Sequence, residues 1–238
     1  MRTIAALAGA CALLLAPAAA AQQAGGLRVS PVLIEIPAER GIGSFRVRND
    51  RASEAAFEVQ VFAWSQETGE DVLTPTDALI AAPSVFLMPV GGEQIVRLGQ
   101  PLEIRDVSRE RAYRVVLREL PSGEPSASGF RVLVEMSMPV FVQPGAAEGR
   151  LALSRTRDSS GASAIAFVNS GAGHVRIGAA HAQSAIDPPR YVLAGARLTR
   201  RVERELETLT LITAGAGTPA PHAQTFELSD APVLADLH

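Results

Sequence analysis

The residue types that carry acid–base and metal chemistry are few in this sequence, and their spacing fits no catalytic motif. The four histidines all lie in the second half: His174, His181, His222 and His238. None belongs to an HExxH motif or to a pair at metal-ligand spacing. His174 follows Gly173 in a predicted turn and His238 ends the chain, so we expect both to be solvated. Glu70 and Asp71 are adjacent in a polar turn, where carboxylates are normally solvated. We therefore predict no metal site.

Nucleophilic and phosphate-binding motifs are also missing. The sequence has no G-x-S-x-G motif, and its single cysteine, Cys11, lies in an apolar N-terminal segment. The stretch "TAGAGTPA" (213–220) lacks the third glycine of a dinucleotide fingerprint and the lysine of a phosphate loop. These observations argue against an enzyme and predict no small-molecule cofactor.

The chemistry that the residues do favour is binding through an apolar strand. In "FRVLVEMSMPVFVQP" (130–144), every second side chain over nine residues is apolar: Phe130, Val132, Val134, Met136 and Met138. Strict alternation is typical of a strand with one buried face. Each such side chain contributes about 1.5–3 kcal/mol when fully buried, so five could hold a partner, and a bare edge of this kind would promote aggregation. Alternatively the apolar side chains face the core of their own domain, and the residues alone favour that interpretation.

An N-terminal leader precedes the rest of the chain. Residues 1–21 combine an early cation, Arg2, an apolar run from Ile4 to Leu15 and an Ala-x-Ala pattern, which predicts a secretory signal peptide cleaved after Ala20 or Ala21. The apolar run is too short to span a bilayer. The exported chain would have about 217 residues (238 − 21) and no cysteine, so it must fold without disulfides.

The charge balance limits the possible partners. The chain has 22 cationic and 25 anionic residues, for a net charge of −3, which argues against nucleic-acid binding. All the cations are arginines, so any anion site must use arginine.

Short alternating segments fill the first half of the chain. They predict seven strands, at 27–36, 43–49, 56–64, 84–90, 93–99, 112–120 and 130–142. Gly/Asn/Asp-rich turns separate them, which is typical of a β-sandwich. We expect Phe62 and Trp64 to pack in the core or at a strand end.

A Gly/Ala-rich break at 143–150 separates this half from a second set of strands. These are predicted at 151–157, 163–171, 174–180, 191–198, 206–213 and 224–230, with a loop at 213–224. "RRVERELETL" (200–209) could instead form a helix with i,i+4 charge pairs. Asn49 and Asn169 each end a strand before a turn, a shared pattern. We predict an all-β protein with domains at 22–145 and 146–238 after the 1–21 leader.

Six motifs in order resemble one family. They are "SPVLIEI", "RVRND", "FEVQVFAWSQ", "LTPTDALIAAPSVFLMPVGGEQIVRL", "YRVVLRELP" and "MPVFVQP". This order is similar to that in periplasmic pilus chaperones, most of all the archaic, spore-coat-protein-U-type branch. The resemblance covers about residues 27–144 and continues more loosely into "AFVNSGAGHVRI".

The resemblance implies a fold, a location and a function. Such chaperones are periplasmic and have two immunoglobulin-like β-sandwich domains set at an angle. The last strand of the first domain donates its alternating side chains to a pilin subunit that lacks its own final strand, and the chaperone delivers the subunit to an outer-membrane usher. Chaperone–pilin complexes are an established case of strand addition. Phe130, Val132, Val134, Met136 and Met138 fall on this donor strand.

The resemblance also suggests where a subunit carboxylate would be held. Better-known members use an arginine on the first strand and a lysine on the last, but Leu33 and Pro139 stand near those positions here. The archaic branch is similar in lacking this pair and uses an arginine that follows a tyrosine, which here is Arg114, with Arg97 as a possible neighbour. Arginine suits a carboxylate because it can form two parallel charge-assisted bonds. Alternatively, Arg114 pairs structurally with Glu119 or Glu135.

Two other classes of function fit less well. A secreted structural or adhesive β-sandwich protein such as a pilin should carry a long donor arm, but only "QQAGG" (22–26) separates the leader from the first strand. A hydrolase or carbohydrate-binding module is disfavoured by the missing catalytic clusters and by the few aromatic residues (8 Phe, 2 Tyr and 1 Trp).

Overall fold

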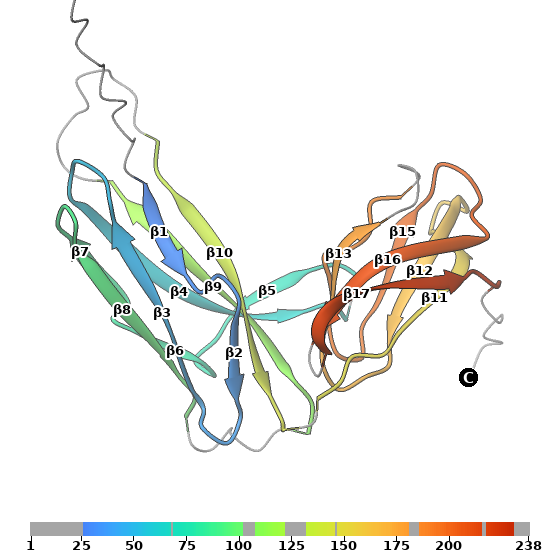
Figure 1. Ribbon diagram of the computed structural model, residues 1–238, viewed down its shortest axis with the longest axis horizontal. Coiled ribbons are helices and arrows are strands. Elements are labelled where there is room, and N and C mark those ends of the chain that lie inside the picture. The colour runs from blue at the N-terminus through green and yellow to red at the C-terminus, as the bar shows by residue number, and fades with distance from the viewer. Residues whose placement is uncertain are drawn as a thin grey trace, which may run out of the picture.

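The structure, a computed structural model, describes residues 26–67, 69–101, 108–121, 132–145, 147–180, 186–215 and 218–230. Every regular element in these ranges is a strand, and the strands form four sheets arranged as two sandwiches set at an angle (Figure 1). Among the described residues there is no helix with the length and apolarity needed to cross a membrane. The predicted leader, 1–21, lies outside the described residues.

The N-terminal sandwich has one four-stranded and one six-stranded sheet. The first has the order β1 (Leu27–Ser30), β3 (Ile42–Asn49), β8 (Glu93–Gly99), β6 (Ile80–Ala82). The second has the order β2 (Ile34–Pro37), β10 (Glu135–Gln143), β9 (Arg111–Leu120), β4 (Ala55–Ser65), β5 (Val72–Pro75), and β7 (Val85–Met88) also pairs with β4. Alternate side chains of both sheets meet in a core that includes Phe45, Phe57, Leu117 and Met138.

The chain changes sheet between β1 and β2. β1 pairs with β3 in the first sheet, and after three residues β2 joins the second sheet, parallel to β10. Pro31 has no N–H to continue the first ladder. β2 contacts β10 only at residues 140–143, so the start of β10 has β9 on one side and no described strand on the other.

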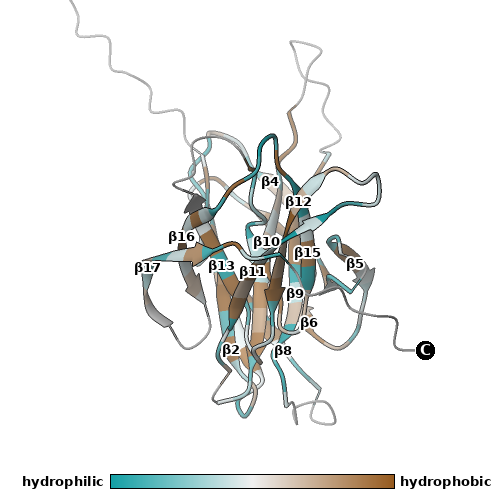
Figure 2. Cartoon of the chain, turned by 90° about the vertical axis from the view of Figure 1, so that its right-hand side faces the viewer, coloured by the Kyte–Doolittle hydropathy of each residue, from teal (hydrophilic) through white to brown (hydrophobic). Residues whose placement is uncertain are grey.

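The C-terminal sandwich packs a three-stranded against a four-stranded sheet. The first has the order β11 (Leu151–Arg157), β12 (Ser163–Asn169), β15 (Arg197–Arg201). The second has the order β14 (Tyr191–Val192), β13 (Val175–Ala180), β16 (Thr208–Gly215), β17 (Thr218–Glu227). Figure 2 shows hydrophobic residues following the central strands of the molecule. The change of sandwich falls between Gln143, where β10 ends, and Leu151.

Some sequence expectations need correction. The strand predicted at 27–36 is two strands in different sheets, and the short exposed strands β5 and β6 were not predicted. The helix alternative at 200–209 is wrong, because β15 continues to Arg201 and β16 starts at Thr208 with no helix between them. The loop predicted at 213–224 is largely a hairpin. Its prolines lie on β17, an edge strand, where a missing N–H is tolerated.

The two asparagines that share a sequence pattern also share a structural role. Both are fully buried. Asn49 Nδ2 donates to Ser53 O at 2.8 Å and Asn169 Nδ2 donates to Gly173 O at 2.8 Å, in each case the carbonyl four residues on. Each Oδ1 accepts the amide two residues on, and each Nδ2 also donates to two carbonyls of a distant segment. The same side chain therefore closes the same kind of turn in both sandwiches.

Candidate functional site

The two halves of β10 have different neighbours. Residues 140–143 lie between β9 and β2, whereas residues 135–139 pair only with β9. Glu119 N donates to Val134 O at 2.8 Å, so the alternation of an antiparallel ladder directs the N–H and C=O groups of Glu135 and Ser137 away from β9. No described strand pairs with them. Pro139, which has no N–H, ends this free edge where β2 begins.

Burial changes along the same strand. Val132 is 87% exposed and Val134 is half-buried, Met136 packs partly against the core, and Met138 is 1% exposed within it. The prediction that Met138 can bind a partner is therefore wrong, because its side chain already fills this domain's own core. Met136 is largely committed to the same core. Val132 and Val134 remain candidates for the donor strand, and Phe130 lies outside the described residues.

Arg114 lies on β9 opposite Pro139, at the level where the free edge ends. Its guanidinium Cζ lies 3.8 Å from the Trp64 ring centroid and 5.7 Å from that of Tyr191. Burial lowers the pKa of this half-buried arginine, while the nearby negative charge of Asp71 opposes that shift. A guanidinium nevertheless stays charged in proteins.

The alternative partners for Arg114 are occupied by other residues. Glu119 binds Arg51 through both oxygens at 2.9 Å, and Glu135 binds Arg118 at 2.8 Å. The structural pairing of Arg114 with Glu119 or Glu135 is therefore wrong. Within the described ranges, no carboxylate lies within ion-pair distance of Arg114. Its guanidinium can therefore donate hydrogen bonds to a carboxylate from another molecule.

Arg97 does not belong to the same site. It lies on β8, in the other sheet of the N-terminal sandwich, between the buried residues Val96 and Leu98. Because side chains alternate along a strand, Arg97 points out of the opposite side of the sandwich. The structure does not bring it near Arg114, and that prediction is wrong.

A buried pair that the sequence did not suggest joins the two sandwiches. His174 is 1% exposed, and its Nδ1 lies 2.9 Å from Oε2 of Glu110. The His174 backbone N–H donates to Glu110 Oε1 at 2.9 Å, and its ring stacks on Phe141 at a centroid distance of 3.6 Å. The expectation that His174 is solvated is therefore wrong. No local pattern links it to Glu110, which lies 64 positions earlier.

Gln66 connects the sandwiches at a second point. Its Nε2 donates to Tyr191 O at 3.1 Å and to Asp71 Oδ1 at 2.7 Å, while Leu193 N donates to its Oε1 at 2.8 Å. Trp64, from the first sandwich, meets Tyr191, from the second, edge-on at 5.5 Å. Trp64 thus packs at a strand end, as expected. That strand end lies at the junction of the two sandwiches, and the Arg114 guanidinium lies over the indole ring of Trp64.

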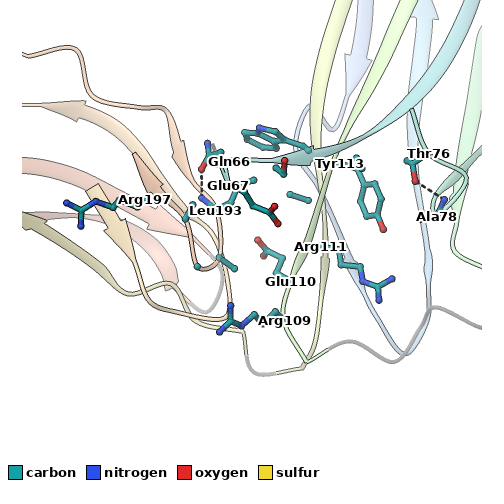
Figure 3. Close-up of a pocket in the computed structure, with 17 residues that line it drawn as sticks. Gln66, Glu67, Thr76, Ala78, Arg109, Glu110, Arg111, Tyr113, Leu193 and Arg197 are labelled. Carbon is teal, nitrogen blue, oxygen red and sulfur yellow. Dashed lines mark hydrogen bonds between the residues drawn. The ribbon is translucent and has the colours of Figure 1, made fainter. Parts of the chain in front are cut away.

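A cavity of about 560 Å³ adjoins this junction. Figure 3 shows Glu67 and Glu110 extending into it from the ends of neighbouring strands, and the Gln66–Leu193 hydrogen bond beside it. Arg109 and Arg111 also line it, so its charges are mixed. In the part of the chain that the structure describes, no cluster of His, Cys, Asp or Glu is arranged to hold a metal.

This chain resembles known proteins in sequence over its N-terminal domain and in structure over most of its two domains. Residues 26–148 match the family of pili and flagellar-assembly chaperones, PapD N-terminal domain. No curated protein sequence matches the chain significantly.

Solved structures share the two-sandwich fold. One is a chain of the CsuC–CsuE chaperone–tip adhesion subunit pre-assembly complex from the archaic chaperone-usher Csu pili of Acinetobacter baumannii. It has a TM-score of 0.72 and 17% identity over 87% of this chain and 100% of that one. The complex of Salmonella enterica SafA pilin with the SafB chaperone gives a TM-score of 0.65 and 12% identity over 85% and 96%. The Pseudomonas aeruginosa CupB2 chaperone gives a TM-score of 0.57 and 13% identity over 84% of this chain and 100% of that one.

Proposed function

Because the chain belongs to the family of pili and flagellar-assembly chaperones, we propose that it binds pilin subunits in the periplasm and delivers them to an outer-membrane usher. It stabilises each subunit by donor-strand complementation through the first half of β10. The observation that carries this proposal is the free edge at residues 135–139, preceded by Val132, which is 87% exposed.

The free edge supplies both parts of strand recognition. The outward N–H and C=O groups of Glu135 and Ser137 can pair with a subunit strand whatever its sequence, which gives affinity. Val132 and Val134 project beyond the core on the inner face, and pockets for alternate side chains give specificity. Such an edge is an aggregation hazard when it is bare, so a client that covers it accounts for its retention.

Arg114 is the proposed anchor for the subunit's C-terminal carboxylate. Its guanidinium lies over Trp64 of β4, on the far side of β9 from β10, so the bound carboxylate lies over the outer face of the sheet rather than at its edge. The anchor is level with Pro139, and the donor residues lie towards the start of β10. A subunit strand that ends at Arg114 and covers Val132 therefore runs parallel to β10.

The test is co-expression with pilin subunits encoded beside this protein, followed by purification of the soluble complex. Val132→Asp and Val134→Asp place a charge in the subunit's apolar groove, and we expect both to abolish co-purification. Ile95→Asp is the matched control, because Ile95 is an exposed apolar residue on the other sheet. Full pilin recovery with folded Val132→Asp and Val134→Asp proteins would overturn the proposal.

A further inference from the structure

A hollow of about 500 Å³ lies on the four-stranded sheet of the C-terminal sandwich. Its floor is apolar and includes the half-buried Ile212 and Ala214 of β16 and the exposed Gly178 of β13. Two arginines line it, Arg176 of β13 and Arg190, which directly precedes β14. We name it the arginine hollow.

The charges of the arginine hollow favour an anion. Within the ranges that the structure describes, neither Arg176 nor Arg190 has a carboxylate within ion-pair distance, and this includes Asp187, which also lines the hollow. The wall therefore carries two cations and one anion. A guanidinium matches the geometry of a carboxylate, so the hollow suits an acidic side chain whose methylene groups rest on the apolar floor.

The arginine hollow lies on the face that meets the N-terminal sandwich. Val175 and Ile177 point into the C-terminal core, so alternation along β13 turns His174 and Arg176 to the outer face. On that face His174 stacks on Phe141 of β10. The surface that carries Arg176 therefore continues directly from the junction of the two sandwiches.

Tyr191 links the arginine hollow to the proposed anchor. It is the register partner of Arg176, and its ring centroid lies 5.7 Å from Cζ of Arg114. Paired Cα atoms of neighbouring strands are about 5 Å apart, so, with the tyrosine side chain included, the hollow begins within about 15 Å of the anchor. About five residues of an extended chain span that distance.

The two sites also interact electrostatically. Burial lowers the pKa of Arg114, and the positive charge of Arg190 lowers it further, so the two cations are close enough to repel each other. Negative charge bound beside them removes this repulsion. A molecule whose carboxylate is held at Arg114 is therefore placed to put a second acidic group in the hollow.

We propose that the arginine hollow binds an acidic side chain of the pilin subunit whose C-terminal carboxylate is held at Arg114. This inference rests on the proposed function and adds a charge-selective contact on the second sandwich. A subunit with a neutral or basic residue at that position gains no such contact, so the hollow discriminates between subunits.

The experiment measures the affinity of a co-encoded pilin subunit for charge variants of the chaperone. We expect Arg176→Glu and Arg190→Glu each to weaken binding about tenfold or more, because each places a like charge beside the acidic occupant. Asp187→Asn should tighten binding, because it removes the anion that repels the same occupant. Arg157→Glu is the charge-matched control, since Arg157 is an exposed arginine on β11, in the other sheet of the same sandwich.

The outcomes separate this inference from the proposed function. Wild-type affinity of both hollow variants, while Val132→Asp loses the subunit, would overturn the arginine hollow and leave the proposed function standing. Equal weakening by Arg157→Glu would also overturn the hollow, because it would show an effect of net charge alone. Wild-type affinity of Val132→Asp as well as of the hollow variants would overturn both.

A second variant fills the arginine hollow without changing its charge. A Cβ added at Gly178 would meet no atom closer than 3.7 Å, so Gly178→Leu can enter the hollow without displacing its neighbours. We expect this variant to fold as the wild type does, by circular dichroism, and to bind the subunit several-fold more weakly. Wild-type affinity of folded Gly178→Leu would overturn the proposal.

Discussion

The alternating stretch that leads into and through β10 changes from exposed to buried along its length. Met138, Val140 and Val142 are at most 1% exposed, and β2 completes the sheet beside the last two. Val132 shares their side of the strand but is 87% exposed, with no described strand beside it. The difference lies in how far the domain's own core extends, because Met138 is buried in that core although no described strand lies beside it. It teaches that an alternating pattern specifies a face that must be covered, without specifying whether the chain itself covers it.

The sharpest test of this contrast places the same charge in both halves. We expect Val140→Asp to prevent folding of the N-terminal domain. A typical domain is stable by roughly 5–15 kcal/mol, and burying an unpaired charge costs a large part or all of that stability. Val132→Asp should change the free energy of unfolding by less than about 0.5 kcal/mol. Urea unfolding measures both. A large destabilisation by Val132→Asp would mean that both halves belong to the core.

A second test removes a support of the enclosed half. His174 stacks on Phe141 of β10 and lies 2.9 Å from Glu110. His174→Ala removes the imidazole beside the buried Glu110, which keeps only the hydrogen bonds from Gln143 Nε2 and the backbone N–H of residue 174, so we expect a loss of about 3 kcal/mol in urea unfolding. Arg118→Ala, which breaks the exposed Arg118–Glu135 pair beside the free half, should change the stability far less, because exposed ion pairs contribute little. Equal losses of stability in the two variants would show that the contacts at the junction do not stabilise the enclosed half more than the exposed pair stabilises the free half.

Arg114 marks the boundary between the halves and should act on binding rather than on stability. We expect Arg114→Ala to weaken subunit binding by about 2–5 kcal/mol, because it removes a charged hydrogen-bonded anchor. Circular dichroism should show an unchanged fold. Arg97→Ala is the matched control and should bind as the wild type does. Retained binding by Arg114→Ala, or its failure to fold, would show that Arg114 is structural.

Hydrogen exchange should locate the boundary itself and is expected to show the smallest effect. The Ser137 amide points to the free edge, whereas the Phe141 amide points to β2. Ser137 should therefore exchange on the order of tenfold faster or more in the free protein, and adding the subunit should slow it. Equal protection of the two amides in the free protein would mean that something already pairs with the first half.

The sequence was sufficient for the fold because period-2 alternation and Gly/Asn turns are local signals. Asn49 and Asn169 are predictable for the same reason, since each bonds the backbone within four residues. The site was only partly predictable. The pattern from Val132 to Met138 could not show where the core ends, because that depends on how far the other sheet of the sandwich extends over the strand. Glu110 and His174 could not be paired, since a contact across 64 positions leaves no local pattern.

The position at which the chain crosses from β1 to β2 sets the length of the free edge of β10. β2 joins β10 at Val140, so the site of the switch from one sheet to the other decides how many residues of β10 are left for another molecule. Moving the switch two residues earlier would let β2 pair with Ser137 and shorten the open stretch by about 7 Å. Insertions or deletions in the 31–33 connection should therefore change the length of subunit strand that can pair with β10, without altering any residue that contacts the subunit.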